Sequence, residues 1–472
     1  MCDIYTSMGG LRRQIFAAFI GSISIISSGM AYGWVSPVLN QLSDEDGEIR
    51  ATKEQISWIA ADIEIGCLLT PLIGTFLMDK FGRKWPMLCA VPLFMISWIL
   101  TLATRSVQIL YIKRMLDGMG IGLVVTIAPI YLAEIAEANI RGLIIMSIAV
   151  TWYGGILIQF CLGTYLSYNV SAWINLVVPI LYLILFSFLP ESPYYFMMKK
   201  QENKAADSLA WFQNVRPNEV FEELKDIKSY LEEDAKNKES WKAVIKNTTY
   251  RKCLAIMIVV ILATILTGLT TIFSYASEMF ADTDSEGFLN PDTCSVAIAT
   301  LFCVMSIVIY FLIDKIGRRP LIIVSAFGCF LSNLASAVFS YYKNEFKYKW
   351  IPLVTIGSYC FFVTLGLVPV MLVFQGELFP SSIRTFASGM IIVITTFVSL
   401  VALKLYYIIG SSIGIYVNYL IYAVVAGTST VWLIFYCPET KNKTFAELLK
   451  ELEGTNVGEK MLYREEMQML NK

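Results

Sequence analysis

The sequence predicts an all-α integral membrane protein, with twelve transmembrane helices in two pseudo-symmetric six-helix bundles and a helical linker domain on the cytoplasmic side. Of its 472 residues, 56% are hydrophobic and only 16% are charged, a composition too apolar for a soluble protein of this length. Twelve apolar runs approach or exceed the roughly 20 residues that a helix needs to cross a bilayer. Short charged motifs recur in the second half in the order of the first. Together these three observations indicate a duplicated bundle of membrane helices.

The twelve apolar runs fall into two groups of six. The first group lies at residues 14–38, 56–78, 86–104, 109–133, 143–166 and 172–189. The second group lies at residues 253–279, 293–313, 321–342, 351–378, 386–409 and 415–436. Arg12 and Arg13 precede the first run, and no small-residue cleavage site ends it, so we expect a retained helix rather than a signal peptide.

Lysine and arginine in the short loops predict the orientation. If twelve helices alternate, Arg12, Arg13 and the basic motifs at 79–84 and 314–319 lie on one side, which the positive-inside rule makes cytoplasmic. We therefore expect a multi-pass protein of the plasma membrane with both termini in the cytoplasm. Asn169, in the sequence N-V-S, then lies on the outer side and is a candidate glycosylation site.

A long polar segment separates the two groups of spans. Within it, Val220, Leu224, Ile227 and Leu231 recur at helical spacing among charged residues. This pattern predicts an amphipathic helix lying under the bundles. We divide the chain into a first bundle at residues 1–196, the linker at 197–251, a second bundle at 252–437 and a cytoplasmic tail at 438–472.

Three charged motifs occur once in each half and follow the second, fourth and sixth span. The pairs are DKFGRK at 79–84 with DKIGRR at 314–319, the E-x6-R spacing of Glu134 and Arg141 with that of Glu377 and Arg384, and PESP at 190–193 with PETK at 438–441. Six helices were therefore duplicated in parallel orientation, as expected for two bundles that rock against each other around a central site.

These motifs place charges at the cytoplasmic ends of helices, where water makes them far less costly than in the membrane interior. We expect them to form a gate that pairs across the two halves when the cytoplasmic mouth is closed, and whose charges separate into water when it opens. Exposed ion pairs contribute about 0–1 kcal/mol each, so several are needed. The alternative is that the clusters only set topology. The predicted gate residues are Asp79, Arg83, Lys84, Glu134, Arg141, Glu191, Asp314, Arg318, Arg319, Glu377, Arg384 and Glu439.

The same motifs resemble those of the sugar porter family of the major facilitator superfamily. The stretch RMLDGMGIGLVVTIAPIYLAEIAEANIRG at 114–142 is similar to the family's fourth-helix signature, and GELFPSSIR and PETKNKTFAEL to its later motifs. SWIAADIEIG in the second span is most similar to insect facilitated trehalose transporters and related hexose carriers. The resemblance implies the major facilitator fold and facilitative, alternating-access passage of a sugar, trehalose or a glucose-like hexose.

The resemblance also implies where a sugar binds. Gln159 matches the family's fifth-helix glutamine, but threonines replace the amides of the seventh helix, and Phe302 stands where the family has an asparagine. Hydroxyls still bind hydroxyls, so we expect a weaker site or a different substrate. A polyol carrier and a transport-poor nutrient sensor therefore remain as alternatives. The candidate substrate-binding residues are Gln159, Thr264, Thr267, Thr270, Tyr275, Thr395 and Ser399.

Ionisable groups inside the spans bear on energy coupling. Proton-linked members of the family carry an aspartate in the first helix, where this chain has Ala31. Its absence favours downhill facilitation. Arg114 and Asp117 remain in the fourth span, and we expect them to neutralise each other as an i,i+3 pair.

Several classes of function are excluded. The chain has no histidine, its ten cysteines form no C-x-x-C pair, and it carries no nucleotide-binding loop, so we expect neither an enzyme nor a bound metal or cofactor. A net charge of −1 gives no reason to expect nucleic acid. The expected partners are a small sugar and the lipid bilayer, and we expect a monomer.

Overall fold

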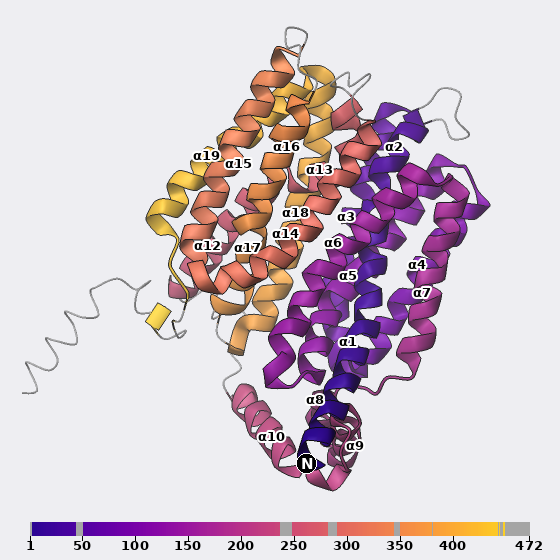
Figure 1. Cartoon of the computed structure of the whole chain (residues 1–472), viewed down its shortest axis with the longest axis vertical. Coiled ribbons are helices and arrows are strands. Elements are labelled where there is room, and N and C mark those ends of the chain that lie inside the picture. Colours follow the sequence, from indigo (N-terminus) through magenta and orange to yellow (C-terminus); the bar gives the residue numbers. More distant parts are fainter. Residues whose placement is uncertain are drawn as a thin grey trace, which may run out of the picture.

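A computed structural model describes the chain at residues 2–43, 51–236, 248–281, 290–343, 350–379, 381–441, 443, 447 and 448. Its helices form two bundles side by side, coloured indigo to magenta and orange to yellow in Figure 1. Twelve helical stretches in the described part are long and apolar enough to span a membrane, which confirms the predicted number. Large side chains such as Phe188 and Phe435 are exposed on the outer faces, as a lipid environment requires.

Seven helices make the six spans of the first bundle. They are α1 (Cys2–Gly33), α2 (Val35–Ser43), α3 (Lys53–Phe81), α4 (Lys84–Ala103), α5 (Val107–Ile135), α6 (Ala138–Tyr165) and α7 (Tyr168–Ser187). The second bundle contains α12 (Thr248–Ile265), α13 (Leu269–Ala281), α14 (Pro291–Ile316), α15 (Arg318–Tyr341), α16 (Ile351–Phe362), the π-helical turn η2 (Val363–Leu367), α17 (Val368–Glu377), α18 (Ser381–Ser412) and α19 (Ile415–Tyr436).

Two spans of the second bundle are interrupted, which hydropathy alone does not reveal. Gly268 separates α12 from α13 at a φ of +110°, a conformation that favours glycine. In the tenth span, the η2 turn frees backbone groups that one side chain satisfies: Ser325 Oγ donates to Phe362 O and accepts from Leu367 N. Such breaks in the regular helix often accompany functional sites.

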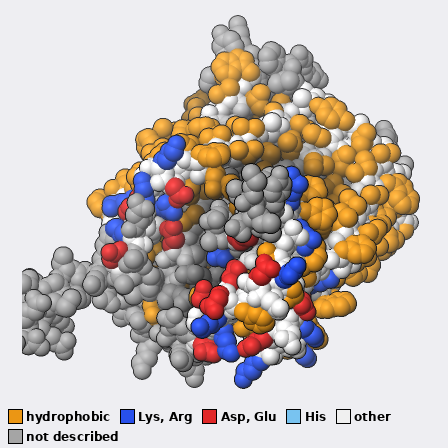
Figure 2. Space-filling model, turned by 60° about the horizontal axis from the view of Figure 1, so that its bottom comes forward, with side chains coloured by type: hydrophobic (Ala, Val, Ile, Leu, Met, Phe, Trp, Pro, Cys, Tyr) orange, Lys and Arg blue, Asp and Glu red, His pale blue; other side chains and the backbone are white. Residues whose placement is uncertain are grey.

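The segment between the bundles folds as short helices beneath the first bundle (Figure 1). They are α8 (Pro193–Met198), α9 (Glu202–Gln213), the 3-10 turn η1 (Pro217–Glu219) and α10 (Phe221–Lys236). Val220, Leu224 and Ile227 pack with Leu209 in a small apolar core, which is the face that the helical spacing predicts. We call this side of the molecule the linker end. Viewed from there, charged side chains gather within a surround of apolar ones (Figure 2).

The bundles contact each other mainly along three helix pairs, α3 with α18, α6 with α14 and α2 with α13. The third pair lies opposite the linker, at what we call the far end (Figure 1). There the N–H of Ser277 on α13 lies 3.3 Å from Oγ of Ser36, in α2. Both side chains are fully buried, so the two bundles are closed against each other at the far end.

Candidate functional site

Arg83 and Glu134 form a bidentate ion pair at the linker end of the first bundle. Arg83 follows α3, and Glu134 lies in the last turn of α5. The guanidinium Nε and Nη2 lie 2.9 and 2.7 Å from the two carboxylate oxygens. Their side chains are only 6% and 13% exposed. Ser192, beyond α7, donates its hydroxyl to the same carboxylate, so three separate segments meet at this pair.

A second carboxylate, Glu191, caps the start of α4. It accepts the backbone N–H groups of Arg83 and Lys84 at 2.9 and 3.0 Å, where both hydrogen bonding and the helix dipole favour an anion. Gly82 has a φ of +94°, and a Cβ on it would lie 2.2 Å from Glu191 Oε2. The glycine of DKFGRK is therefore required both by the turn and by the acid beside it.

The second bundle repeats this arrangement. Arg318 Nη2 donates to Glu377 at 2.9 Å, and the N–H groups of Arg318 and Arg319 donate to Glu439 at 3.0 and 3.1 Å. Gly317 has a φ of +102°, and a Cβ there would lie 2.8 Å from Glu439 Oε2. The repeat in the sequence thus corresponds to a repeat of contacts: one acid pairs with the arginine, and another caps the next helix.

The two capping acids differ in their surroundings. Burial raises the pKa of Glu191 above its ordinary value, despite the N–H groups that point at it. Burial alone would also raise the pKa of Glu439, but four backbone N–H groups around this half-buried carboxylate hold it below its ordinary value. The pseudo-symmetry of the contacts therefore does not extend to the direction of the two pKa shifts.

Two charges of the predicted gate behave differently from the expectation. With the far end closed, we expected the linker-end charges to separate into water; instead, Arg83 and Arg318 each pair with an acid of their own bundle. Arg141, in α6, likewise donates to the carbonyl of Ala136, two residues before that helix begins. The side chain of Arg384 lies outside the described residues.

The remaining gate residues lie around these pairs. Asp314 is exposed and lies 3.1 Å from Arg318, and Lys84 Nζ donates to the carbonyl of Ser187 at 2.7 Å. Asp79 is exposed at the end of α3. All of them belong to the linker end.

Three of the predicted substrate-binding threonines bond to their own helices. The hydroxyls of Thr264, Thr267 and Thr395 each donate to a carbonyl four residues earlier, at 2.7, 2.9 and 2.8 Å. This is the usual way for a hydroxyl to be satisfied within an apolar helix. In this state the three side chains still have lone pairs to offer, but their protons are already engaged.

Three other predicted residues are buried and incompletely satisfied. Gln159 Oε1, Thr270 Oγ1 and Tyr275 Oη are buried side-chain atoms without a hydrogen-bond partner among the described residues. Gln159 Nε2 lies 3.4 Å from Ser171 Oγ, and the ring of Tyr275 lies against that of Tyr406, with centroids 4.8 Å apart. An unpaired buried polar atom is costly, so these three positions are the ones that call for a ligand or water.

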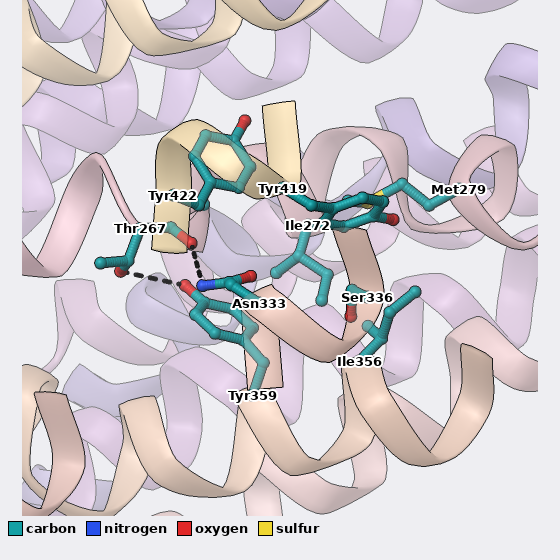
Figure 3. Close-up of a pocket in the computed structure, with 10 residues that line it drawn as sticks. Thr267, Ile272, Met279, Asn333, Ser336, Ile356, Tyr359, Tyr419 and Tyr422 are labelled. Carbon is teal, nitrogen blue, oxygen red and sulfur yellow. Dashed lines mark hydrogen bonds between the residues drawn. The ribbon is translucent and has the colours of Figure 1, made fainter. Parts of the chain in front are cut away.

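A small cavity lies within the second bundle, beside the break at Gly268 (Figure 3). Of the predicted binding residues only Thr267 lines it, with its hydroxyl 3.4 Å from that of Tyr359. Asn333 Nδ2 donates to the carbonyl of Thr267 at 3.2 Å, and Ser336 Oγ is buried there without a partner. The cavity therefore lies beside the helix break and not among the full set of predicted residues.

Aromatic rings fill the contact between the bundles. Tyr153, in α6, stacks on Phe302, in α14, with ring centroids 5.4 Å apart. Phe273, in α13, lies 4.7 Å from Phe302 and 6.2 Å from Tyr32, in α1. These rings come from both bundles and are almost fully buried. Phe302, which replaces an asparagine of the resembled family, thus takes part in the packing between the bundles.

Arg114 binds backbone carbonyls more closely than it binds an acid. It donates to the carbonyls of Ala31 and Ile59 at 2.8 and 3.0 Å, while Asp117 lies 4.0 Å away. Lys113 is nearer to Asp117, at 2.7 Å. The predicted pairing of Arg114 with Asp117 is therefore secondary, because the i,i+4 lysine takes the carboxylate and the carbonyl of Ala31 takes the arginine.

Sequence reasoning missed Asn333 and the partner of Glu64. Asn333 is the one amide of its span, a signal that could have singled it out. Glu64, in α3, accepts a hydrogen bond from Tyr32 at 3.0 Å, a pairing that no local spacing reveals. Ser399 is buried, whereas Asn169 is exposed at the start of α7, where its side-chain oxygen accepts from Arg105.

Comparison with known proteins covers nearly the whole chain. The family model described as sugar (and other) transporter matches residues 14–452. A facilitated trehalose transporter Tret1 of Bombyx mori is 25% identical over 449 residues, covering 94% of this chain and 87% of the relative. The Tret1 of Culex quinquefasciatus is also 25% identical, covering 93% of this chain and 86% of its own.

Solved structures share the fold. The Escherichia coli xylose transporter XylE, in a partially occluded inward-open conformation, superposes with a TM-score of 0.76 at 19% identity, covering 92% of this chain and all of the other. The proton:xylose symporter XylE bound to 6-bromo-6-deoxy-D-glucose gives 0.73 at 19% identity, covering 93% and 99%. The twelve helices thus have the arrangement of the major facilitator superfamily.

Proposed function

The chain belongs to the sugar transporter family, and from this membership we propose that it carries a sugar, trehalose or a glucose-like hexose, across a membrane by alternating access. The main support is the family match over residues 14–452, because it spans both bundles. The named relatives are facilitated trehalose transporters of similar length. The activity is transport rather than enzymatic catalysis.

Passage is facilitative rather than proton-driven. Where a proton-linked carrier would place an acid against the arginine of the fourth span, Arg114 donates to the backbone carbonyl of Ala31. A carbonyl takes up no proton at physiological pH, so this contact cannot couple proton binding to movement. Glu64 lies near this arginine but is engaged by the hydroxyl of Tyr32.

The sugar binds between the bundles, near Gln159 and the α13 residues Thr270 and Tyr275. The basis is that each offers a buried polar atom without a partner. A sugar presents hydroxyls that can donate to the amide oxygen of Gln159 and exchange bonds with the two hydroxyls. Aromatic rings beside such groups suit the apolar faces of a pyranose. Thr264, Thr267 and Thr395 can offer lone pairs while their protons stay bonded to their own helices, and Ser399 is a further buried hydroxyl.

The membrane is the plasma membrane, and the linker end faces the cytoplasm. Both termini lie on that side, and Asn169 lies outside as a glycan acceptor. The basic motifs of the linker end support this orientation. The linker-end clusters then brace the cytoplasmic end of each bundle, and the far-end contacts close the outer mouth. The structure is therefore assigned to the cytoplasm-facing half of the transport cycle.

Uptake of radiolabelled trehalose, glucose and a polyol into oocytes tests the function, measured with and without an imposed proton gradient. Expected results are saturable sugar uptake that equilibrates without accumulation and does not respond to the gradient. Gln159→Leu should raise the KM for the sugar while surface expression stays unchanged, and Gln14→Leu, at the linker end, is the matched control away from the proposed site. Accumulation against the concentration gradient would refute the facilitative mechanism.

A polyol is the second candidate substrate, because Phe302 removes an amide at the place where the resembled family binds a sugar ring. A linear polyol needs fewer fixed amides than a ring does, since its hydroxyls can turn toward those present. The same uptake assay separates the two, because preference for the polyol over both sugars would favour this reading.

A further inference from the structure

Lys404 is a charged side chain in the long apolar helix α18. Ionisable residues within membrane helices are costly and usually functional, so its partners deserve explanation. Its Nζ donates to Ser57 Oγ at 2.8 Å and lies 3.8 Å from the centroid of the Trp58 ring. Ser57 and Trp58 belong to α3, in the first bundle, whereas α18 belongs to the second. The contact therefore crosses between the bundles.

The contact lies toward the far end. Helix α3 runs from Lys53 to Phe81 beside the DKFGRK motif of the linker end, so Ser57 and Trp58 occupy its first turns at the opposite end. Helix α18 runs the other way and reaches Lys404 about two turns before it ends at Ser412.

Two acids of α3 add to the attraction. Glu54 and Asp62 are each close enough to Lys404 to attract its charge. They lie one turn before and one turn after Trp58, on the same face of α3. One bundle therefore places a ring face and a hydroxyl in contact with the ammonium, and two carboxyl groups in its wider surroundings.

We propose that Lys404 is a positioning residue for transport, which holds the far end closed through a cation–π contact with Trp58 and a hydrogen bond to Ser57. When the far ends of the bundles part, the ammonium loses the indole face and the hydroxyl together and exchanges them for water, so the cation–π attraction is lost. The clasp therefore favours the far-end-closed state. It differs from the linker-end clusters, whose ion pairs stay within one bundle. The inference rests on the proposed alternating access.

A cysteine reporter at Ser277 tests the clasp. Ser277 is buried against Ser36 of the other bundle, so a thiol there becomes reachable from the far side only when that end opens. Ser277→Cys is introduced into the full chain in oocytes, and its modification by a membrane-impermeant methanethiosulfonate is timed from outside. The chain without this substitution gives the background from the ten native cysteines.

Lys404→Met keeps the length of the side chain but removes its charge. It should raise the rate of modification by about 2- to 30-fold, the shift in an equilibrium that loss of a cation–π contact produces. Lys404→Arg keeps a cation over the ring, so the thiol at position 277 should be modified at nearly the same rate as in the chain with the native lysine. An unchanged rate in Lys404→Met would overturn the proposal and make the lysine a group that merely reaches the membrane surface.

A second pair of variants decides the matter if Lys404→Met does not reach the membrane. Trp58 is 40% exposed, so its replacement should be tolerated in folding. Trp58→Leu should speed modification, whereas Trp58→Phe, which keeps a ring face, should speed it less. Equal modification rates in Trp58→Leu and Trp58→Phe would overturn the proposal that the ring of Trp58 holds the far end closed. The reporter needs no substrate, so a chain that carries none of the tested sugars would refute the proposed function and leave this measurement intact.

Discussion

The pairing of Arg83 with Glu134 leads to a quantitative prediction about which residues act together. If the linker-end clusters brace each bundle separately, Arg83→Met and Glu134→Gln should be strongly non-additive, because either change alone removes the same contact. Arg83→Met and Glu377→Gln, which lies in the other bundle, should be additive. If the charges instead paired across the bundles, Arg83→Met and Glu377→Gln would be non-additive, and Arg83→Met and Glu134→Gln would be additive.

The size of the effect follows from the geometry. The pair has two charge-assisted hydrogen bonds at 2.9 and 2.7 Å between side chains that are 6% and 13% exposed. Bonds to charged groups contribute about 1.5–3 kcal/mol each, and loss of one partner from a buried pair costs about 3–5 kcal/mol. Since water reaches the linker end, we expect a coupling energy below these values for fully buried groups, about 2 kcal/mol.

Denaturant titration of the purified protein in mixed micelles measures this energy as a double-mutant cycle on the free energy of unfolding. The Arg318–Glu377 pair is the matched comparison, and its greater exposure, at 12% and 34%, predicts a smaller coupling of about 1 kcal/mol. Coupling between Arg83 and Glu377 that equals or exceeds coupling between Arg83 and Glu134 would refute the account of separate braces.

Two further predictions concern the helix caps. Because burial raises the pKa of Glu191, its contribution to stability is present at low pH and lost as pH rises through that pKa. The difference in melting temperature between wild type and Glu191→Gln should therefore widen as pH falls from about 8 to about 5. Glu439 has a lowered pKa, so its contribution is fully present above the ordinary carboxyl pKa of 4.5 and is lost only as pH falls below that value. The difference in melting temperature between wild type and Glu439→Gln should therefore stay constant from about pH 8 to about pH 5 and narrow from about pH 4.5 to about pH 3; melting temperatures over the whole range check both signs. Gly82→Ala should cost about 2–4 kcal/mol of unfolding free energy, from strain and a displaced cap, whereas Gly142→Ala, with its nearest neighbouring atom at 3.9 Å, should cost little; equal losses would contradict this.

The sequence was sufficient for the number of spans and for their duplication. Apolar length determines whether a helix can cross a bilayer, and this property can be read locally. The recurring DKFGRK and DKIGRR motifs also mark equivalent places, since each glycine has a positive φ and borders a capping acid. Because the turn requires both a positive φ and space for the acid, its glycine can be recognised from the sequence.

The partners of the interior residues could not be predicted in the same way. Hydropathy does not report which way a helix is rotated, so it gave no sign that Phe302 would stack on Tyr153 across the bundles. Nor did spacing distinguish Lys113 from Arg114 as the nearer partner of Asp117, because i,i+3 and i,i+4 neighbours are both within reach. Such choices depend on the tertiary environment of each side chain.

The uninterrupted course of α1 has a mechanical consequence. Its 32 residues form a rod about 48 Å long, at 1.5 Å per residue. About a third of the way along it, Arg13 donates to the carbonyl of Trp211 in the linker; near its end, Tyr32 meets Trp152 and Phe273. A stiff lever of this kind carries any tilt or twist of the linker directly to the rings at the middle of the molecule.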